Sequence, residues 1–175
     1  MSVKNGYNTT RKEYFHTLVI GDASGNNGEK DFTFFNKNSG STDGGVFDTN
    51  WCASDNAVPA HNIMKLLRVG FTAVGASGAA LTVATIANLA KSIVTIKIGD
   101  REILNESLLS FIKIPGANSA SLISDFNTGP SYKEILEETA NAKDVIDFEV
   151  HIPANIGQQI RLTAILDTIN SAKQG

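Results

Sequence analysis

Residues 144–170 read DVIDFEVHIPANIGQQIRLTAILDTIN, and this stretch decides the fold class. Apolar side chains occupy every second position of 146–152, and charged or polar side chains stand between them. The same alternation runs through 160–166, after the break at 153–157, although Ile165 interrupts its polar side. A side-chain period of two is that of a strand with one buried face. The stretch therefore predicts a pair of antiparallel strands in one sheet.

Further strands are expected outside this stretch, where short apolar or aromatic runs are separated by turn residues. They lie at 14–20, 31–36, 62–73, 93–98 and 101–104. Gly99-Asp100 is a two-residue turn signal, so the last two runs are expected to form a hairpin. The side chains predicted to form the core are Phe34, Val69, Phe71, Val94, Ile96, Ile98, Ile146, Phe148, Val150, Ile152 and Leu162.

A chain of 175 residues is long enough to bury one core, so we expect a single domain over 1–175. Residues 1–13 are polar and are expected to form an N-terminal arm. Short helices are expected at 80–92, where β-branched residues also suit a strand, and at 131–142. The many short strands and long loops predict an all-β sandwich or barrel with one or two short helices.

Composition disfavours several functions. Lys and Arg number 15 against 18 for Asp and Glu, and this formal charge of -3 offers no basic surface for phosphate backbones. Specific nucleic-acid binding is therefore not expected. Cys52 is the only cysteine, so no disulfide can form within the chain, which suits a reducing cytosol. The N-terminus lacks a secretory signal, and no apolar run approaches the roughly 20 residues of a membrane span.

Residues that could carry out chemistry are few. The three histidines are widely spaced and lie in no catalytic motif, and no Gly-x-Ser-x-Gly nucleophile elbow is present. The loop at 22–29 collects oxygen ligands, but a calcium loop of the EF-hand type needs Gly and Glu where this chain has Asn27 and Thr33. We therefore expect no catalytic residue, no metal, no cofactor and no small-molecule substrate.

A series of short segments follows along the chain: FTFFN at 32–36, DTNW at 48–51, VPAHNI at 58–63, LRV at 67–69, VTIKIGDRE at 94–102, LLSFIKIP at 108–115 and FEVHIP at 148–153. In this order the segments resemble a pattern of the jelly-roll capsid proteins of tailless bacteriophages. The resemblance extends from about residue 31 to about residue 166. The order of the segments carries it, because each segment alone is short.

The resemblance implies a single jelly roll that assembles with copies of itself, or with another capsid protein, into an icosahedral shell. Such a protein is made in the host cytoplasm and located in the virion. The resemblance is also compatible with a lipid membrane beneath the shell as a further partner. Polar loops at 21–28 and 37–45 would supply interfaces between subunits. The candidate interface residues are Asn26, Asn27, Asn38, Asp43, Phe47, Trp51 and His61.

Two other function classes stay open. Trp51 and the neighbouring aromatic residues suit a binding module, such as a trimeric spike or fibre head or a carbohydrate-binding sandwich, in which an indole stacks on a sugar. Core filling and subunit contact are the competing explanations for these aromatic residues. An enzyme on a cupin-like barrel is the third class, and it would need three metal-ligating histidines on nearby strands.

Overall fold

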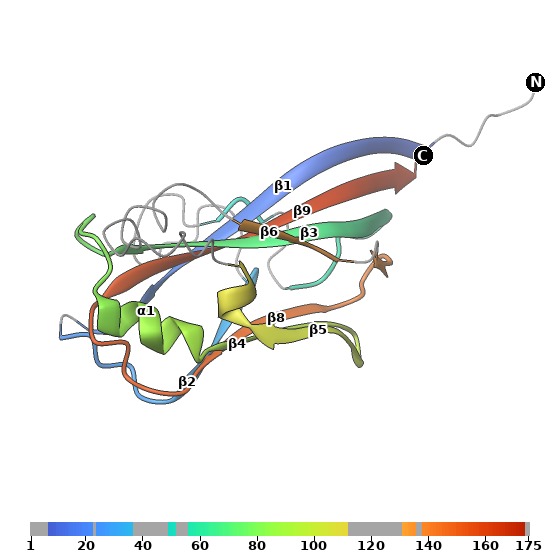
Figure 1. Cartoon of the computed structure of the whole chain (residues 1–175). Coiled ribbons are helices and arrows are strands. Elements are labelled where there is room, and N and C mark those ends of the chain that lie inside the picture. Colours follow the sequence, from blue (N-terminus) through green and yellow to red (C-terminus); the bar gives the residue numbers. More distant parts are fainter. Residues whose placement is uncertain are drawn as a thin grey trace, which may run out of the picture.

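A computed structural model of the chain describes residues 7–22, 24–36, 49–51, 56–111, 131–135 and 138–173. These residues form two antiparallel sheets packed face to face, with a short helix at one end (Figure 1). The architecture is an all-β sandwich, as the alternating sequence pattern predicts.

The first sheet has the strand order β1-β9-β3-β6, and the short strand β7 also pairs with β3. Its strands are β1 (Tyr7–Ile20), β9 (Ile160–Lys173), β3 (Asn62–Gly75), β6 (Ser131–Glu134) and β7 (Thr139–Ala140). The second sheet has the order β2-β8-β4-β5. Its strands are β2 (Lys30–Phe34), β8 (Ile146–Ile152), β4 (Ile93–Ile98) and β5 (Arg101–Ser107). Helix α1 (Val83–Ala90) and a 3-10 turn, η1 (Leu108–Phe111), complete the described elements.

The stretch that decides the fold class does form two strands, but they do not pair with each other. Strand β8 lies in the second sheet between β2 and β4, whereas β9 lies in the first sheet between β1 and β3. The break at 153–159 carries the chain from one sheet to the other, and Ile156 within it is buried. Alternation shows which face of a strand is buried but not which strand lies beside it, so the expected pairing was wrong.

Two other expectations need correction. Residues 131–142 were expected to contain helix, but they contribute β6 and β7 because the exposed edge of β3 offers them backbone partners. Pairing with a neighbouring strand here overrides local helical spacing. Residues 7–13 of the expected arm belong to β1, which pairs with β9 along its whole length. The hairpin of β4 and β5 and the helix within 80–92 are confirmed.

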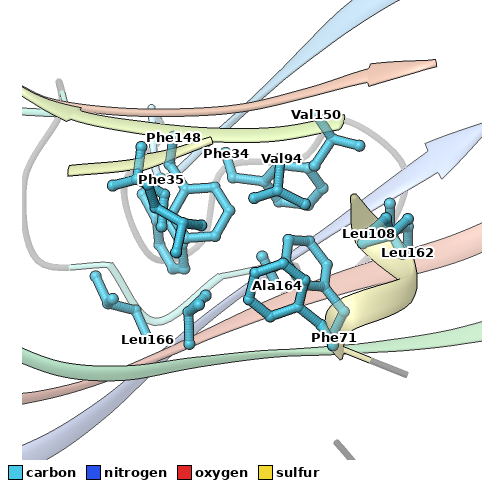
Figure 2. Close-up of a cluster of buried hydrophobic side chains, with 14 of the residues drawn as sticks. Phe34, Phe35, Phe71, Val94, Leu108, Phe148, Val150, Leu162, Ala164 and Leu166 are labelled. Atoms are coloured by element: carbon cyan, nitrogen blue, oxygen red, sulfur yellow. The ribbon is translucent and has the colours of Figure 1, made fainter. Parts of the chain in front are cut away.

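The core lies between the two sheets, where Phe34, Phe148 and Val150 point toward Phe71 and Ala164 (Figure 2). Each of the predicted core side chains is buried. The ring centroid of Phe148 lies 5.9 Å from that of Phe34, 5.2 Å from Phe35 and 5.7 Å from Phe71. These are the spacings of edge-on and tilted aromatic pairs, which add to the stabilisation from burial itself.

Polar contacts join the sheets on the two sides of the sandwich. On one side, Lys133 of β6 forms an ion pair with Glu106 of β5, so the outer strands of the two sheets are linked. On the other side, the backbone N–H of Phe35 donates to Nδ1 of the buried His16 at 2.6 Å, which links the end of β2 to β1. Both contacts bring together residues far apart in the sequence.

Candidate interaction surfaces

One end of the sandwich is built from three loops that are tied together by side-chain amides. Asn27 carries most of this network: its Oδ1 accepts from the backbone N–H of Ile156 at 2.8 Å, and its Nδ2 donates to the carbonyl of Ala154 at 3.1 Å. Asn155 forms two hydrogen bonds in return. Its Oδ1 accepts from the backbone N–H of Asn27 at 3.1 Å, and its Nδ2 donates to Asn26 Oδ1 at 3.2 Å. The predicted interface residues Asn26 and Asn27 thus lie together and fix the loop geometry.

The same loops approach each other closely at Gly25. The backbone N–H of Gly157 donates to the Gly25 carbonyl at 3.0 Å. A Cβ atom at Gly25 would lie 2.1 Å from the backbone nitrogen of Gln158, and Gly25 has a φ of +78°. Only glycine meets both conditions without strain.

Helix α1 is joined to this end through Gln158 and Asn88. Gln158 Oε1 accepts from the backbone N–H of Thr82 at 3.0 Å, and Gln158 Nε2 donates to the carbonyl of Ala80 at 3.1 Å. Asn88 Nδ2 donates to the carbonyl of Asn155 at 2.9 Å. Thr82 also caps the helix, because its hydroxyl accepts from the backbone N–H of Thr85. The loop end is therefore a preorganised surface.

Asp22 lies in the loop that collects oxygen ligands, and its carboxylate accepts hydrogen bonds from the backbone of that loop. Its Oδ1 accepts from the backbone N–H groups of Ser24 at 2.8 Å and Asn26 at 2.9 Å. The hydrogen bonds from Asn26 and Ser24 hold the pKa of Asp22 below its usual value. This is the turn-forming role that Asp often has in loops.

The remaining interface candidates divide into three outcomes. Trp51 is fully buried, with its ring centroid 5.0 Å from that of Tyr14 and 5.5 Å from that of Phe35, so its assignment to an exposed interface was wrong. Thr49, two residues before Trp51, forms a backbone bridge with His16 of β1, and this places the buried indole beside that strand. His61 is exposed, in a turn before β3. Asn38, Asp43 and Phe47 lie outside the described residues.

A charged cluster on the outer face of the first sheet was not predicted. Asp167 lies on the outward side of β9, yet it is only 2% exposed. Arg11 of β1 donates to it through Nε at 3.0 Å and Nη2 at 2.5 Å, and Arg68 of β3 donates through Nε at 2.7 Å. The hydrogen bond from Arg11, together with Arg68, holds the pKa of Asp167 below its usual value.

Tyr132 of β6 extends this cluster across the sheet. The guanidinium of Arg68 lies 4.0 Å from the centroid of the Tyr132 ring, and the Tyr132 hydroxyl donates to Glu13 of β1 at 2.7 Å. Burial, the hydrogen bond to Glu13 and the charge of that carboxylate raise the pKa of Tyr132 to about 12. The cluster thus joins β1, β9, β3 and β6.

A β-bulge between Leu66 and Arg68 explains why the sequence did not reveal the cluster. The bulge adds a residue to β3, so Leu66 and Val69 can both be buried while Arg68 faces outward. The charged positions Lys65 and Arg68 interrupt the alternation of β3, and that interruption was the available signal. Near neutral pH neither Asp167 nor Tyr132 is suited to exchange a proton, because one pKa is lowered and the other is about 12. We interpret the cluster as a set of contacts that stabilises the arrangement of the strands.

The outer face of the second sheet contains one histidine between two carboxylates. His151 Nδ1 lies 2.7 Å from Asp31 Oδ1, and its Nε2 lies 3.6 Å from Glu29 Oε1. All three side chains are at least partly exposed. In the described part of the chain, no group of three or more His, Cys, Asp or Glu side chains is arranged to hold a metal ion. The described helices include none with the length and apolar character needed to cross a membrane.

Searches against known protein families and against curated proteins found no match to this chain. The fold and its surfaces are therefore the basis for a functional proposal.

Proposed function

We propose that this protein is a jelly-roll structural subunit that assembles with copies of itself, or with a partner shell protein, into a virion capsid. The observation that carries the proposal is the strand order of the two sheets. β6 and β7 pair with neighbouring stretches of β3, at Arg68–Phe71 and Met64–Lys65, and can be counted as one strand. The eight strands then follow the orders 1-8-3-6 and 2-7-4-5.

This order is what a single long antiparallel hairpin gives when it is wrapped into a sandwich. Strand 1 then pairs with 8, 2 with 7, 3 with 6 and 4 with 5, and all four of these pairings are present. Jelly rolls have this arrangement, and they occur in viral capsids, lectins and cupins. The strand order therefore supports the jelly roll that the sequence resemblance implies, and the sequence resemblance favours the capsid role among these three.

The surfaces support a role in contact between subunits. The loop end is held in one geometry by amide side chains, and the charged cluster locks the four main strands of the first sheet together. Rigid, preorganised surfaces lose little conformational entropy when they associate. The charged cluster is explained as a stabilising contact between the strands, without a catalytic role.

Three of the aromatic side chains that motivated the carbohydrate-binding alternative are buried. Trp51, Phe34 and Phe35 are buried together, so none of them is placed to stack on a sugar. Trp51→Ala would be expected to destabilise the fold, and loss of glycan binding in that variant would not identify a sugar site. A glycan array of the unaltered protein is the appropriate test of this alternative.

Expression of the full chain, followed by sedimentation and negative-stain microscopy, tests the proposed function. We expect closed or partly closed particles, or discrete capsomers, at high protein concentration. Co-expression with candidate shell proteins covers the case in which a partner completes the shell. A protein that remains monomeric under both conditions and is absent from particle fractions would contradict the proposal.

A further inference from the structure

Strand β1 provides an unusually exposed edge. It pairs with β9 on one side, and its residues 8–13 are all exposed, in contrast to the alternation of its second half. Figure 1 shows β1 at the rim of the first sheet, running with β9 beyond the end of the second sheet. Among the strands that the structure describes, none pairs with the rim side of this overhang.

Hydrogen bonds identify which residues direct their backbone toward the rim. The Phe15 N–H donates to Asn50 Oδ1 at 2.6 Å, and the Glu13 carbonyl accepts from Asn50 Nδ2 at 2.9 Å. Asn50 lies on the rim side, opposite β9. Because backbone groups of a strand alternate in direction, Thr9 and Arg11 point the same way as Glu13 and Phe15. The Lys12 carbonyl, at an even position, instead accepts from Thr168 of β9.

Residues 49–51 cover only part of this rim. The backbone and side chain of Asn50 occupy the rim at Glu13 and Phe15, acting like a short piece of paired strand. Among the residues that the structure describes, none forms a hydrogen bond with the rim-facing backbone groups of Thr9 or Arg11. An open edge of this kind is a template for pairing with an extended chain.

We propose that β1 of a second copy pairs with this edge in antiparallel orientation, with Thr10 of each copy on a two-fold axis. In this register Thr9 faces Arg11 of the second copy, and both residues direct their backbone groups across the contact. The two Thr10 side chains then meet as a non-hydrogen-bonded pair, where side chains are closest and threonines form cross-strand hydrogen bonds. The contact is self-complementary, as a two-fold interface requires.

The charges of the strand are compatible with this register. Arg11 is drawn over β9 by its two hydrogen bonds to Asp167, so its charge does not block the rim. Lys12 faces Asn8 of the second copy, and no position faces a residue of like charge. A register shifted to pair Arg11 with Glu13 would place the second copy where Asn50 already lies. The open stretch around Thr10 is therefore the favoured centre.

This inference rests on the proposed assembly function and names one contact through which copies meet. A strand pair of about five residues, 8–12, buries little surface compared with a standard interface, so the contact should depend on protein concentration. An extended segment of a different protein could use the same edge, and the experiment below distinguishes that case.

Disulfide trapping tests the register, using a Cys52→Ser background so that no native thiol interferes. In a non-hydrogen-bonded pair the Cα atoms lie about 4.5 Å apart, which is within disulfide range. Thr10→Cys should therefore give covalent dimers under mild oxidation. Asn8→Cys is the matched control, because its two copies would be roughly 13 Å apart and should not cross-link. Equal cross-linking at both positions, or none at Thr10, would overturn the proposed pairing.

A backbone variant supplies the second test. Thr9→Pro removes a rim-facing N–H while leaving the hydrogen bonds to β9, and proline is tolerated at such edge positions. We expect dimer affinity at least tenfold lower in sedimentation experiments, whereas Thr9→Val should dimerise like the unaltered chain. Undiminished dimerisation of Thr9→Pro would contradict the inference. Particles that form without cross-linking at Thr10 would reject this contact but not the proposed function, whereas a monomeric chain would reject both.

Discussion

Asp167 is buried without belonging to the apolar core, because Arg11 and Arg68 reach over it from the strands on either side. Its pKa is held below the usual value of 3.8, so the carboxylate is charged throughout the neutral range. A charged group that is removed from water must be hydrogen-bonded, and here three donor contacts meet that requirement. The cluster connects single residues to the stability of the first sheet.

Asp167→Asn is expected to lower the free energy of unfolding by roughly 1–3 kcal/mol at neutral pH, because the two guanidinium groups lose their anion. The folded-state pKa of Asp167 is lowered, so its contribution is present above the usual value of 3.8 and is lost as pH falls through the folded pKa. Denaturant unfolding at several pH values measures this. The difference from the unaltered protein should be constant near neutral pH and shrink in acid.

Asp100→Asn is the matched control, because Asp100 is exposed in the turn after β4 and the same charge is removed. Its stability should change little at any pH. A pH-independent difference for Asp167→Asn would show that the charge of Asp167 does not contribute to stability.

Phe148→Ala should cost about 3–5 kcal/mol, since the ring is fully buried among Phe34, Phe35 and Phe71. Thermal or denaturant unfolding measures the loss. Val83→Ala is the control, because Val83 is 71% exposed and its truncation should be almost neutral. A Phe148→Ala variant as stable as the control would mean that β8 does not face the core.

The alternation of apolar and polar residues was enough to predict the inward side chains, including Phe148 and Leu162. It could not predict that Asp167 and Trp51 are buried. Asp167 is covered by arginines from other strands, and Trp51 is positioned by a bridge between Thr49 and β1. Both depend on contacts between residues distant in sequence, which no local pattern contains.

Some strands and helices follow from residues close together in the sequence, whereas others depend on contacts between distant residues. The hairpin of β4 and β5 follows from its Gly99-Asp100 turn, and α1 follows from local spacing. The separation of β8 and β9 into different sheets depends instead on the crossing loop, in which Ile156 is buried and Asn27 supplies the hydrogen bonds. β6 and β7 form because β3 presents an edge to them.

Two glycines of one loop provide a test at this scale. Gly25 and Gly28 both have positive φ, of +78° and +62°, but a Cβ at Gly25 would collide with the backbone at Gln158, whereas one at Gly28 would meet nothing within 4 Å. Gly25→Ala should therefore destabilise the protein well beyond the roughly 1 kcal/mol expected of Gly28→Ala. Thermal unfolding of both variants measures the difference.

Hydrogen exchange adds a local measure, because the loops at 153–159 should lose protection in Gly25→Ala and keep it in Gly28→Ala. Equal stability of the two variants would show that the loops do not meet at Gly25 as described.

At the scale of the whole molecule, the proposed assembly depends on the strand order of the two sheets and on surfaces whose geometry is held by hydrogen bonds. β1 pairs with β9, β2 with β8 and β3 with β6, and these pairings connect distant parts of the chain within one sandwich. The class of this architecture followed from the sequence, because alternation and turn spacing are local. The surfaces that support the proposed assembly, namely the amide-linked loop end and the open edge of β1, required the structure.

Sedimentation velocity of the purified full chain, from micromolar to millimolar concentration, tests the central claim that this sandwich functions by contact with other subunits. We predict concentration-dependent growth beyond the monomer, with assembly reduced by Thr9→Pro and unaffected by Thr9→Val. A single monomeric species over the whole range, alone and with candidate shell partners, would contradict the account.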